Sequence, residues 1–260
     1  MLSTGLVGGI VAGLLGVGGG IVIVPVLEVA LSILKIDPAI RMHVAVATSQ
    51  ATIVLTSISS ARAHHKRDAV NLPLVRRWAP YLFFGALVGV VVADHVHGDV
   101  LSMVFAVVAL LVAVKMMLPL DNHPLAQQVP GGIATPLLPG SIGVLSSMMG
   151  IGGGTLSVPI MTLLNEPIHR AVGTASLFGL AISIPATVGF IVAGWSHPSL
   201  PPGNLGFVNL LGFALIAPAT MLTAPLGARL AHWLPRRHLS LVFGGFLFIV
   251  AARMFYSAFK

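Results

Sequence analysis

Two glycine-rich segments hold residue types that could bind an anion. Gly16-Val17-Gly18-Gly19-Gly20 is followed after four residues by Pro25, and Gly150-Ile151-Gly152-Gly153-Gly154 is followed after four residues by Pro159. Consecutive glycines permit positive φ and let the backbone approach a ligand closely. A helix that begins after each run would point free N–H groups and a partial positive charge at a bound anion. Close helix packing also uses small residues, but the duplication of the motif favours a binding site.

Polar side chains in the apolar stretch after each glycine motif could complete such a pocket. They are Thr48, Ser49 and Gln50 in the first copy, and Thr155, Thr174 and Ser176 in the second. A serine or threonine in an apolar helix commonly bonds to a carbonyl of the preceding turn, so a purely structural role stays open. The amide of Gln50 needs partners when it is buried. We expect the six side chains to donate to the same substrate as the glycine motifs.

Ionisable residues are rare within the apolar sequence, and such groups are functional hypotheses by default in a membrane. Glu28 follows Gly20 by eight residues and could carry a coupling proton, although its counterpart in the second copy, Thr162, is not acidic. Lys115 and Arg253 also occupy matching positions, close enough to segment ends for their charges to reach the membrane interface.

Several kinds of chemistry are disfavoured by the residues present. The chain has no cysteine, which removes disulfides and thiolate metal sites, and its ten histidines form no metal-ligand pattern. We therefore expect no cofactor and no metal. The apolar segments contain no evident Ser/His or His/Asp pair, so we do not expect an enzyme. The glycine motifs lack the strand and the later acid of a dinucleotide-binding loop. The net charge of +7 is explained by basic cytoplasmic loops, and no nucleic acid is expected as a partner.

Composition places the glycine motifs in a membrane protein. The chain is 56% hydrophobic and 8% charged, with a mean hydropathy of +0.98, whereas soluble domains carry roughly 25% charged residues. Apolar runs of about 18 residues or more are long enough to cross hydrocarbon. We count eight apolar segments, which cover residues 2–34, 43–61, 72–93, 100–118, 137–164, 171–194, 207–231 and 239–258. The predicted fold class is an all-α polytopic membrane protein in the lipid bilayer.

The sequence repeats internally well beyond the glycines. Thr48 matches Thr174 at an offset of 126 residues, and Gly89 matches Gly227 and Phe105 matches Phe243 at an offset of 138, whereas the glycine motifs are offset by 134. Two homologous four-segment halves are therefore expected, at residues 1–118 and 137–260, joined by a linker at 119–136. Such repeats with glycine-interrupted segments are typical of secondary transporters.

Charge distribution indicates that the halves are inverted. Basic residues follow the second apolar segment of the first half but the third segment of the second half, and cytoplasmic loops are the basic ones. Inversion requires an odd number of crossings per half, so the first, glycine-broken segment of each half is predicted to re-enter or to be discontinuous. Its two parts are too short to span a bilayer of ~30 Å. Eight full spans in two parallel halves are the alternative.

Three features of the sequence carry a resemblance to a known family: the two glycine motifs, the matching boxes Ala47-Thr48-Ser49 and Gly173-Thr174-Ala175, and the stretch Pro225-Leu226-Gly227-Ala228-Arg229-Leu230. Together they resemble the TauE/SafE sulfite exporter family, also called the toluene sulfonate uptake permease family. The resemblance covers nearly the whole chain. It implies a multi-pass permease of the bacterial inner (plasma) membrane for sulfite or organosulfonates such as sulfoacetate. Family members are thought to link export or uptake to the proton-motive force.

From these observations we expect a secondary transporter that moves a small sulfur-containing anion by alternating access, with export as the expected direction. An anion channel, or a permease for another small organic anion, is the alternative reading. A cation carrier that uses Glu28 is weaker because no second buried acid accompanies it. A homodimer is possible.

Overall fold

The structure is a computed structural model that describes residues 6, 8–11, 19–118, 134–231 and 236–258. Gly16 and Gly18, two of the predicted site residues, lie outside the described residues. So does most of the expected linker at 119–136. The sixth helix begins at Ala134, inside the range expected for that linker.

The described chain is mainly helical, as the sequence predicts. The first half contains α2 (Gly20–Ile33), α3 (Pro38–His65), α4 (Leu72–Asp94) and α5 (Gly98–Met117). The second half contains α6 (Ala134–Met149), α7 (Gly154–Leu163), α8 (Ile168–Ala193), α9 (Leu210–Ala231) and α10 (Arg236–Ala258). Two short antiparallel strands, β1 (Asn204–Leu205) and β2 (Val208–Asn209), pair in the loop before α9.

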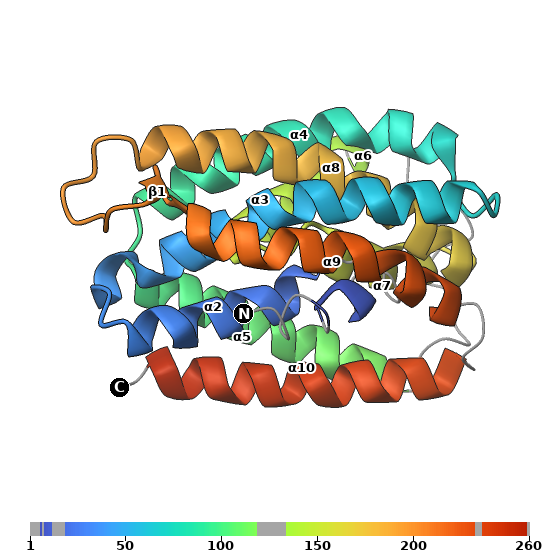
Figure 1. Cartoon of the computed structure of the whole chain (residues 1–260). Helices are drawn as coiled ribbons and strands as arrows, with labels where there is room; N and C mark the ends of the chain where they lie inside the picture. The colour runs from blue at the N-terminus through green and yellow to red at the C-terminus, as the bar shows by residue number, and fades with distance from the viewer. Residues whose placement is uncertain (1–5, 7, 12–18, 119–133, 232–235, 259–260) are drawn as a thin grey trace.

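The described helices differ in length and hydropathy. Among the described residues, five stretches are long and apolar enough to cross: α3, α4, α5, α8 and residues 210–227 of α9. The helices α2 and α7 have 14 and 10 residues. At 1.5 Å per residue they reach only ~21 Å and ~15 Å, short of the ~30 Å hydrocarbon core. In Figure 1, α2 lies toward the left end of the bundle and α7 toward the right end.

The long helices pack lengthwise in a bundle (Figure 1), and the most extensive contacts join the two halves. α5 packs on α10, α4 on α6 and α8, and α3 on α8 and α9. Small residues permit the closest approach: a Cβ on Gly85 of α4 would meet the carbonyl oxygen of Gly140 in α6. Trp78 of α4 stacks on Phe178 of α8 at 5.6 Å between ring centroids. Large apolar side chains on the outside, such as Leu222 at 76% exposed, suit a lipid environment.

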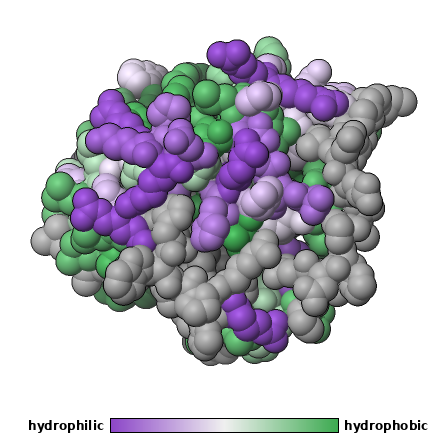
Figure 2. Space-filling view, turned by 90° about the vertical axis from the view of Figure 1, so that its right-hand side faces the viewer, coloured by the Kyte–Doolittle hydropathy of each residue, from purple (hydrophilic) through white to green (hydrophobic). Residues whose placement is uncertain are grey.

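The bundle has two chemically different ends. The end formed by the α3–α4 connection carries Lys66 and Arg67, and Arg229 lies near the end of α9 on the same side. Figure 2 shows this end face-on, with hydrophilic side chains gathered over it. The opposite end holds the β1–β2 loop (Figure 1), and residues 194–209 contain no Lys, Arg, Asp or Glu.

Candidate functional site

The described glycine motif forms a buried turn between α6 and α7. Gly150, Gly152 and Gly153 have φ of 67°, 62° and 78°, a left-handed conformation that costs other residues energy. The turn is stabilised by its own backbone, since the N–H of Ile151 donates to the Ser146 carbonyl at 3.2 Å and the N–H of Gly154 donates to the Gly152 carbonyl at 3.0 Å. Glycine is therefore required here by backbone geometry.

Two short helices begin in the same unusual way. Gly153 is the N-cap of α7, with φ 78°, and Gly19 is the N-cap of α2, with φ 82°. Neither helix has a side-chain cap or an acidic residue in its first turn. A helix N-terminus without a side-chain cap keeps its partial positive charge for another partner.

The glycine motifs of the two halves are in contact. A Cβ on Gly20 would meet the carbonyl oxygen of Gly150, and it would lie 2.8 Å from the Cα of Ile151. The start of α2 and the α6–α7 turn are thus packed backbone to backbone. This brings together Gly20 and Gly150, predicted site residues that are far apart in the sequence.

Two of the predicted polar residues, both on α3, hold the turn in place. The Ser49 hydroxyl donates to the Gly150 carbonyl at 2.7 Å. The Gln50 amide nitrogen donates to the carbonyls of Ser146 at 3.0 Å and Ser147 at 3.3 Å. Carbonyls in the last turn of a helix lack their usual intrahelical partners, so Gln50 caps the end of α6. Both side chains are fully buried.

Several other polar atoms near the turn are buried without a hydrogen-bond partner among the described residues: Gln50 Oε1 and the hydroxyls of Ser57, Ser146, Thr155, Ser157 and Ser183. The Ser57 hydroxyl and the Gly152 carbonyl both adjoin Gly179 of α8. The Ser146 hydroxyl would lie 3.9 Å from a Cβ on Gly153. Buried hydroxyls are normally bonded, so this cluster offers donors and acceptors to a ligand. We call the α6–α7 turn and these side chains the glycine-turn cluster.

Thr48 and Thr174 each accept a hydrogen bond from a distant backbone N–H. Thr174 Oγ1 accepts the backbone N–H of Asn71, and Thr48 Oγ1 accepts that of Asn209, both at 2.9 Å. Each asparagine in turn accepts a backbone N–H three residues later, from Leu74 at 3.2 Å and from Gly212 at 2.7 Å. The two threonines therefore anchor the starts of α4 and α9. Our sequence analysis missed both asparagines, although their spacing equals the repeat offset of 138.

Ser176, Pro25 and Pro159, which were also predicted to bind substrate, lie within helices. The Ser176 hydroxyl donates to the Gly173 carbonyl at 2.6 Å. Pro25 is buried inside α2 and Pro159 lies inside α7, each beyond the first turn of its helix. The Pro159 carbonyl accepts from Thr162 at 2.8 Å and from Lys115 at 3.4 Å, and Lys115 also donates to the Thr162 hydroxyl at 3.1 Å. A cation near the C-terminus of α7 suits its helix dipole.

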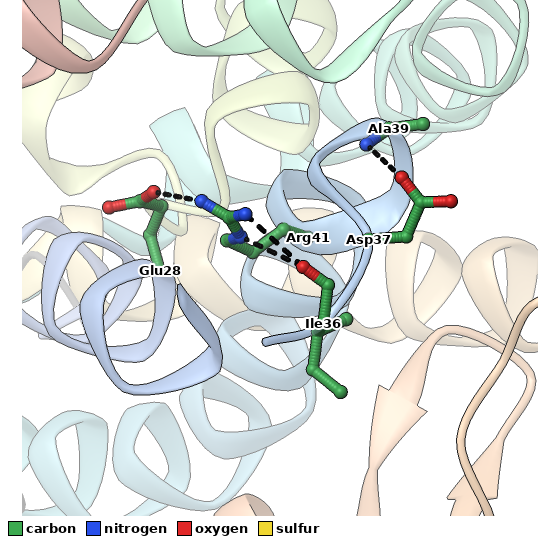
Figure 3. A network of polar contacts seen from close by, with 5 residues as sticks. All are labelled: Glu28, Ile36, Asp37, Ala39 and Arg41. Atoms are coloured by element: carbon green, nitrogen blue, oxygen red, sulfur yellow. Dashed lines mark hydrogen bonds and ion pairs between the residues drawn. The ribbon is translucent and has the colours of Figure 1, made fainter. Parts of the chain in front are cut away.

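Glu28 lies apart from the glycine-turn cluster. It pairs with Arg41 at 3.4 Å, and the Arg41 guanidinium also donates to the Ile36 carbonyl at 3.4 and 3.2 Å (Figure 3). A cavity of about 690 Å³ adjoins this pair and includes Asp99 and Arg253 in its lining. Arg41 was missed because it precedes the apolar segment that begins at residue 43, whereas α3 begins at Pro38. No group of three or more His, Asp or Glu side chains suited to a metal occurs in the described ranges.

Comparison with known proteins gives the family. The model of the family described as "Sulfite exporter TauE/SafE" matches residues 1–254. A "Probable membrane transporter protein" of Haemophilus influenzae is 34% identical over 98% of this chain and 96% of its own length. A "Probable membrane transporter protein YunE" of Bacillus subtilis is 25% identical over the same shares. A similarly described protein of Methanocaldococcus jannaschii is 23% identical over 98% of this chain and 94% of its own length. No solved structure matches. The chain belongs to the TauE/SafE sulfite exporter family.

Proposed function

We propose that this protein is a secondary transporter that moves sulfite or a small organosulfonate across the bacterial inner membrane by alternating access, and that it exports the anion using the proton-motive force. Family membership and relatives described as membrane transporters support this class of function. The observation that carries the proposal is the glycine-turn cluster, where an uncapped helix start meets buried hydroxyls that have no partner among the described residues.

The chemistry of this cluster suits a small oxyanion. The N-terminus of α7 supplies N–H groups and a partial positive charge without a buried Lys or Arg. Serine and threonine hydroxyls donate to anion oxygens and rotate to suit them. A site that holds its anion with dipoles rather than full charges can also release it, which a transporter requires.

Matching contacts in the two halves support an inverted repeat. Thr174 accepts from Asn71 as Thr48 accepts from Asn209. Gly85 lies against Gly140, and their repeat counterparts are also in contact, because Thr223 donates to the Leu6 carbonyl. The short helices α2 and α7 lie toward opposite ends of the bundle (Figure 1). We infer that the basic end faces the cytoplasm, and that one bundle rocks against the other around the glycine motifs.

The test exploits the buried hydroxyls that have no hydrogen-bond partner among the described residues. Purified protein in proteoliposomes would be assayed for saturable sulfite flux under an imposed pH gradient, with Ser57→Ala, Ser146→Ala and Ser183→Ala. Because these hydroxyls bond to nothing in the described protein, their removal should not lower thermal stability. If each bonds the anion, KM should rise about fivefold to tenfold per residue, equivalent to ~1 kcal/mol for a lost hydrogen bond.

Ser141→Ala is the matched control. Ser141 also lies on α6, but it is exposed and donates to the Leu138 carbonyl at 2.9 Å, so its loss should leave KM unchanged. An unchanged KM in all three buried variants would show that the anion does not bind at the glycine turn. Flux that neither saturates nor supports counterflow would identify a channel instead of a carrier. Sulfite that does not move while a carboxylate does would overturn the substrate but not the site.

A further inference from the structure

A second concentration of charge lies at the basic end of the bundle, away from the glycine-turn cluster. A pocket of about 400 Å³ lies between the C-terminal part of α3 and α9. Its lining includes four cationic side chains, those of Arg62, Lys66, Arg67 and Arg229, and no acidic side chain from the part of the chain that the structure describes. A pocket lined by like charges attracts an anion with several oxygens, such as a phosphate.

An apolar pocket adjoins the basic one. It has a volume of about 390 Å³ and is lined by Ile10, Leu226 and Leu230 together with Arg229. Arg229 lines both pockets and therefore stands where the cationic and apolar surfaces meet. Leu226 and Leu230 are 48% and 43% exposed on a helix long and apolar enough to cross a membrane. The combined surface is cationic toward the end of the bundle and apolar alongside it.

A proline of α9, Pro225, is among the residues that line the basic pocket. Pro225 has no backbone N–H, so it cannot donate to the carbonyl of Met221 one turn earlier in α9. The Ser59 hydroxyl of α3 donates to that carbonyl at 2.9 Å. Pro225, Met221 and Ser59 all line the pocket, which is therefore anchored by a specific contact between the helices.

The internal repeat provides a comparison for these cations. In the other half, the positions that match Arg62, Lys66 and Arg67 are Val188, Val192 and Ala193, and the position that matches Arg229 is Val91. These valines are 57%, 69% and 59% exposed, and the last turn of α8 has no basic residue. The fold thus builds the matching helix surface with apolar residues, so packing does not require the four cations.

We propose that the paired pockets bind an anionic glycerophospholipid, with the headgroup phosphate among the four cations and an acyl chain along Leu226 and Leu230. Basic pockets between transmembrane helices on the cytoplasmic side recognise anionic headgroups through this combination of charges. A soluble phosphate would use only the basic pocket, whereas a lipid explains why an apolar pocket shares Arg229. Figure 2 shows the hydrophilic end at which the headgroup would sit.

Native mass spectrometry of the detergent-purified protein tests this proposal without measuring transport. Dioleoylphosphatidylglycerol, dioleoylphosphatidylcholine and sn-glycerol 3-phosphate would be titrated separately. We expect phosphatidylglycerol to bind at least tenfold more tightly than phosphatidylcholine. Each cation near a membrane surface contributes about fivefold in affinity, or ~1 kcal/mol at 1.4 kcal/mol per tenfold. Arg62→Gln with Arg229→Gln should therefore weaken phosphatidylglycerol binding roughly 25-fold.

Two further variants separate the possible outcomes. Arg76→Gln with Arg237→Gln removes the same charge from exposed positions outside the pocket, and it should change the affinity by less than twofold. Leu226→Asn should weaken phosphatidylglycerol binding. The proposal is overturned if the control variant loses as much affinity as the pocket variant. It is also overturned if glycerol 3-phosphate displaces phosphatidylglycerol at equal concentration, which would identify a site for soluble phosphates.

Discussion

Replacing Gly153 with alanine tests whether backbone geometry fixes the turn at the start of α7. Gly153 has φ of +78°, and a Cβ there would meet the terminal methyl group, Cδ1, of Ile182 in α8. Two other glycines separate these effects. Gly203 has φ of +89° with nothing within 4 Å of its Cβ position, whereas Gly140 lies inside α6 and also has nothing within 4 Å.

The magnitudes follow from these three environments. A left-handed alanine costs ~1–2 kcal/mol, and the loss of glycine's freedom in the unfolded chain returns ~0.4–1 kcal/mol. Gly203→Ala should therefore destabilise by ~1 kcal/mol. Gly153→Ala adds an overpacking cost near the lower end of ~1–3 kcal/mol, because the methyl of Ile182 can move, and should destabilise by ~2 kcal/mol. Gly140→Ala should stabilise by up to ~1 kcal/mol because alanine favours the helix.

The assay is the free energy of unfolding, measured by SDS titration in mixed micelles for the three variants. Ile182→Val removes the methyl that Gly153→Ala meets, so the double variant should recover the contact cost and show a coupling energy of ~1 kcal/mol. Equal stability of Gly153→Ala and Gly140→Ala would refute the claim that the positive φ of Gly153 requires glycine. A coupling energy near zero would refute the contact with Ile182.

Three further predictions concern polar side chains of α2, α3 and α8. Thr48→Val and Thr174→Val should each lower the free energy of unfolding by ~1–3 kcal/mol, because each leaves one asparagine backbone N–H unpaired. The two values should be similar, and thermal unfolding and amide exchange would detect the change. Gln50→Leu should cost ~2 kcal/mol by removing the donor to two carbonyls of α6, and an unchanged melting temperature would contradict its capping role. Glu28→Gln should lower the melting temperature, and a double-mutant cycle with Arg41→Gln should give a coupling of ~1 kcal/mol, since that pair is largely buried.

The sequence predicts the architecture well because its signals are local or repeated. Apolar segment lengths predict a helical membrane protein, and five stretches of the described residues are long and apolar enough to cross a membrane. The glycine runs identified the turn after α6, because positive φ is a property of the residue itself. Segment limits were less accurate at polar starts: α3 begins at Pro38, and the apolar pattern begins only at residue 43.

The roles of individual hydroxyls could not be predicted in the same way. Thr48 and Thr174 accept from N–H groups that lie 161 and 103 residues away in the chain. No local pattern distinguishes such a threonine from one that faces a substrate. Gln50 likewise meets α6 only because α3 crosses the glycine turn. The repeat carries the missing signal, since Asn71 and Asn209 match each other just as the two threonines do.

Ser57 and Ser183 are also repeat partners, 126 residues apart, but they contrast with the threonines. Both serines are buried, at 1% and 0% exposed, and neither hydroxyl has a partner among the described residues. A buried unpaired hydroxyl costs ~1–3 kcal/mol, and alanine would fill nearly the same space. Two other polar positions of α3 differ from their matches in α8, with Ser49 matched by Ala175 and Gln50 by Ser176. A costly hydroxyl present in both halves, on helices that differ at other polar positions, favours a shared ligand over helix packing, and this is why Ser57→Ala and Ser183→Ala are the most informative transport variants.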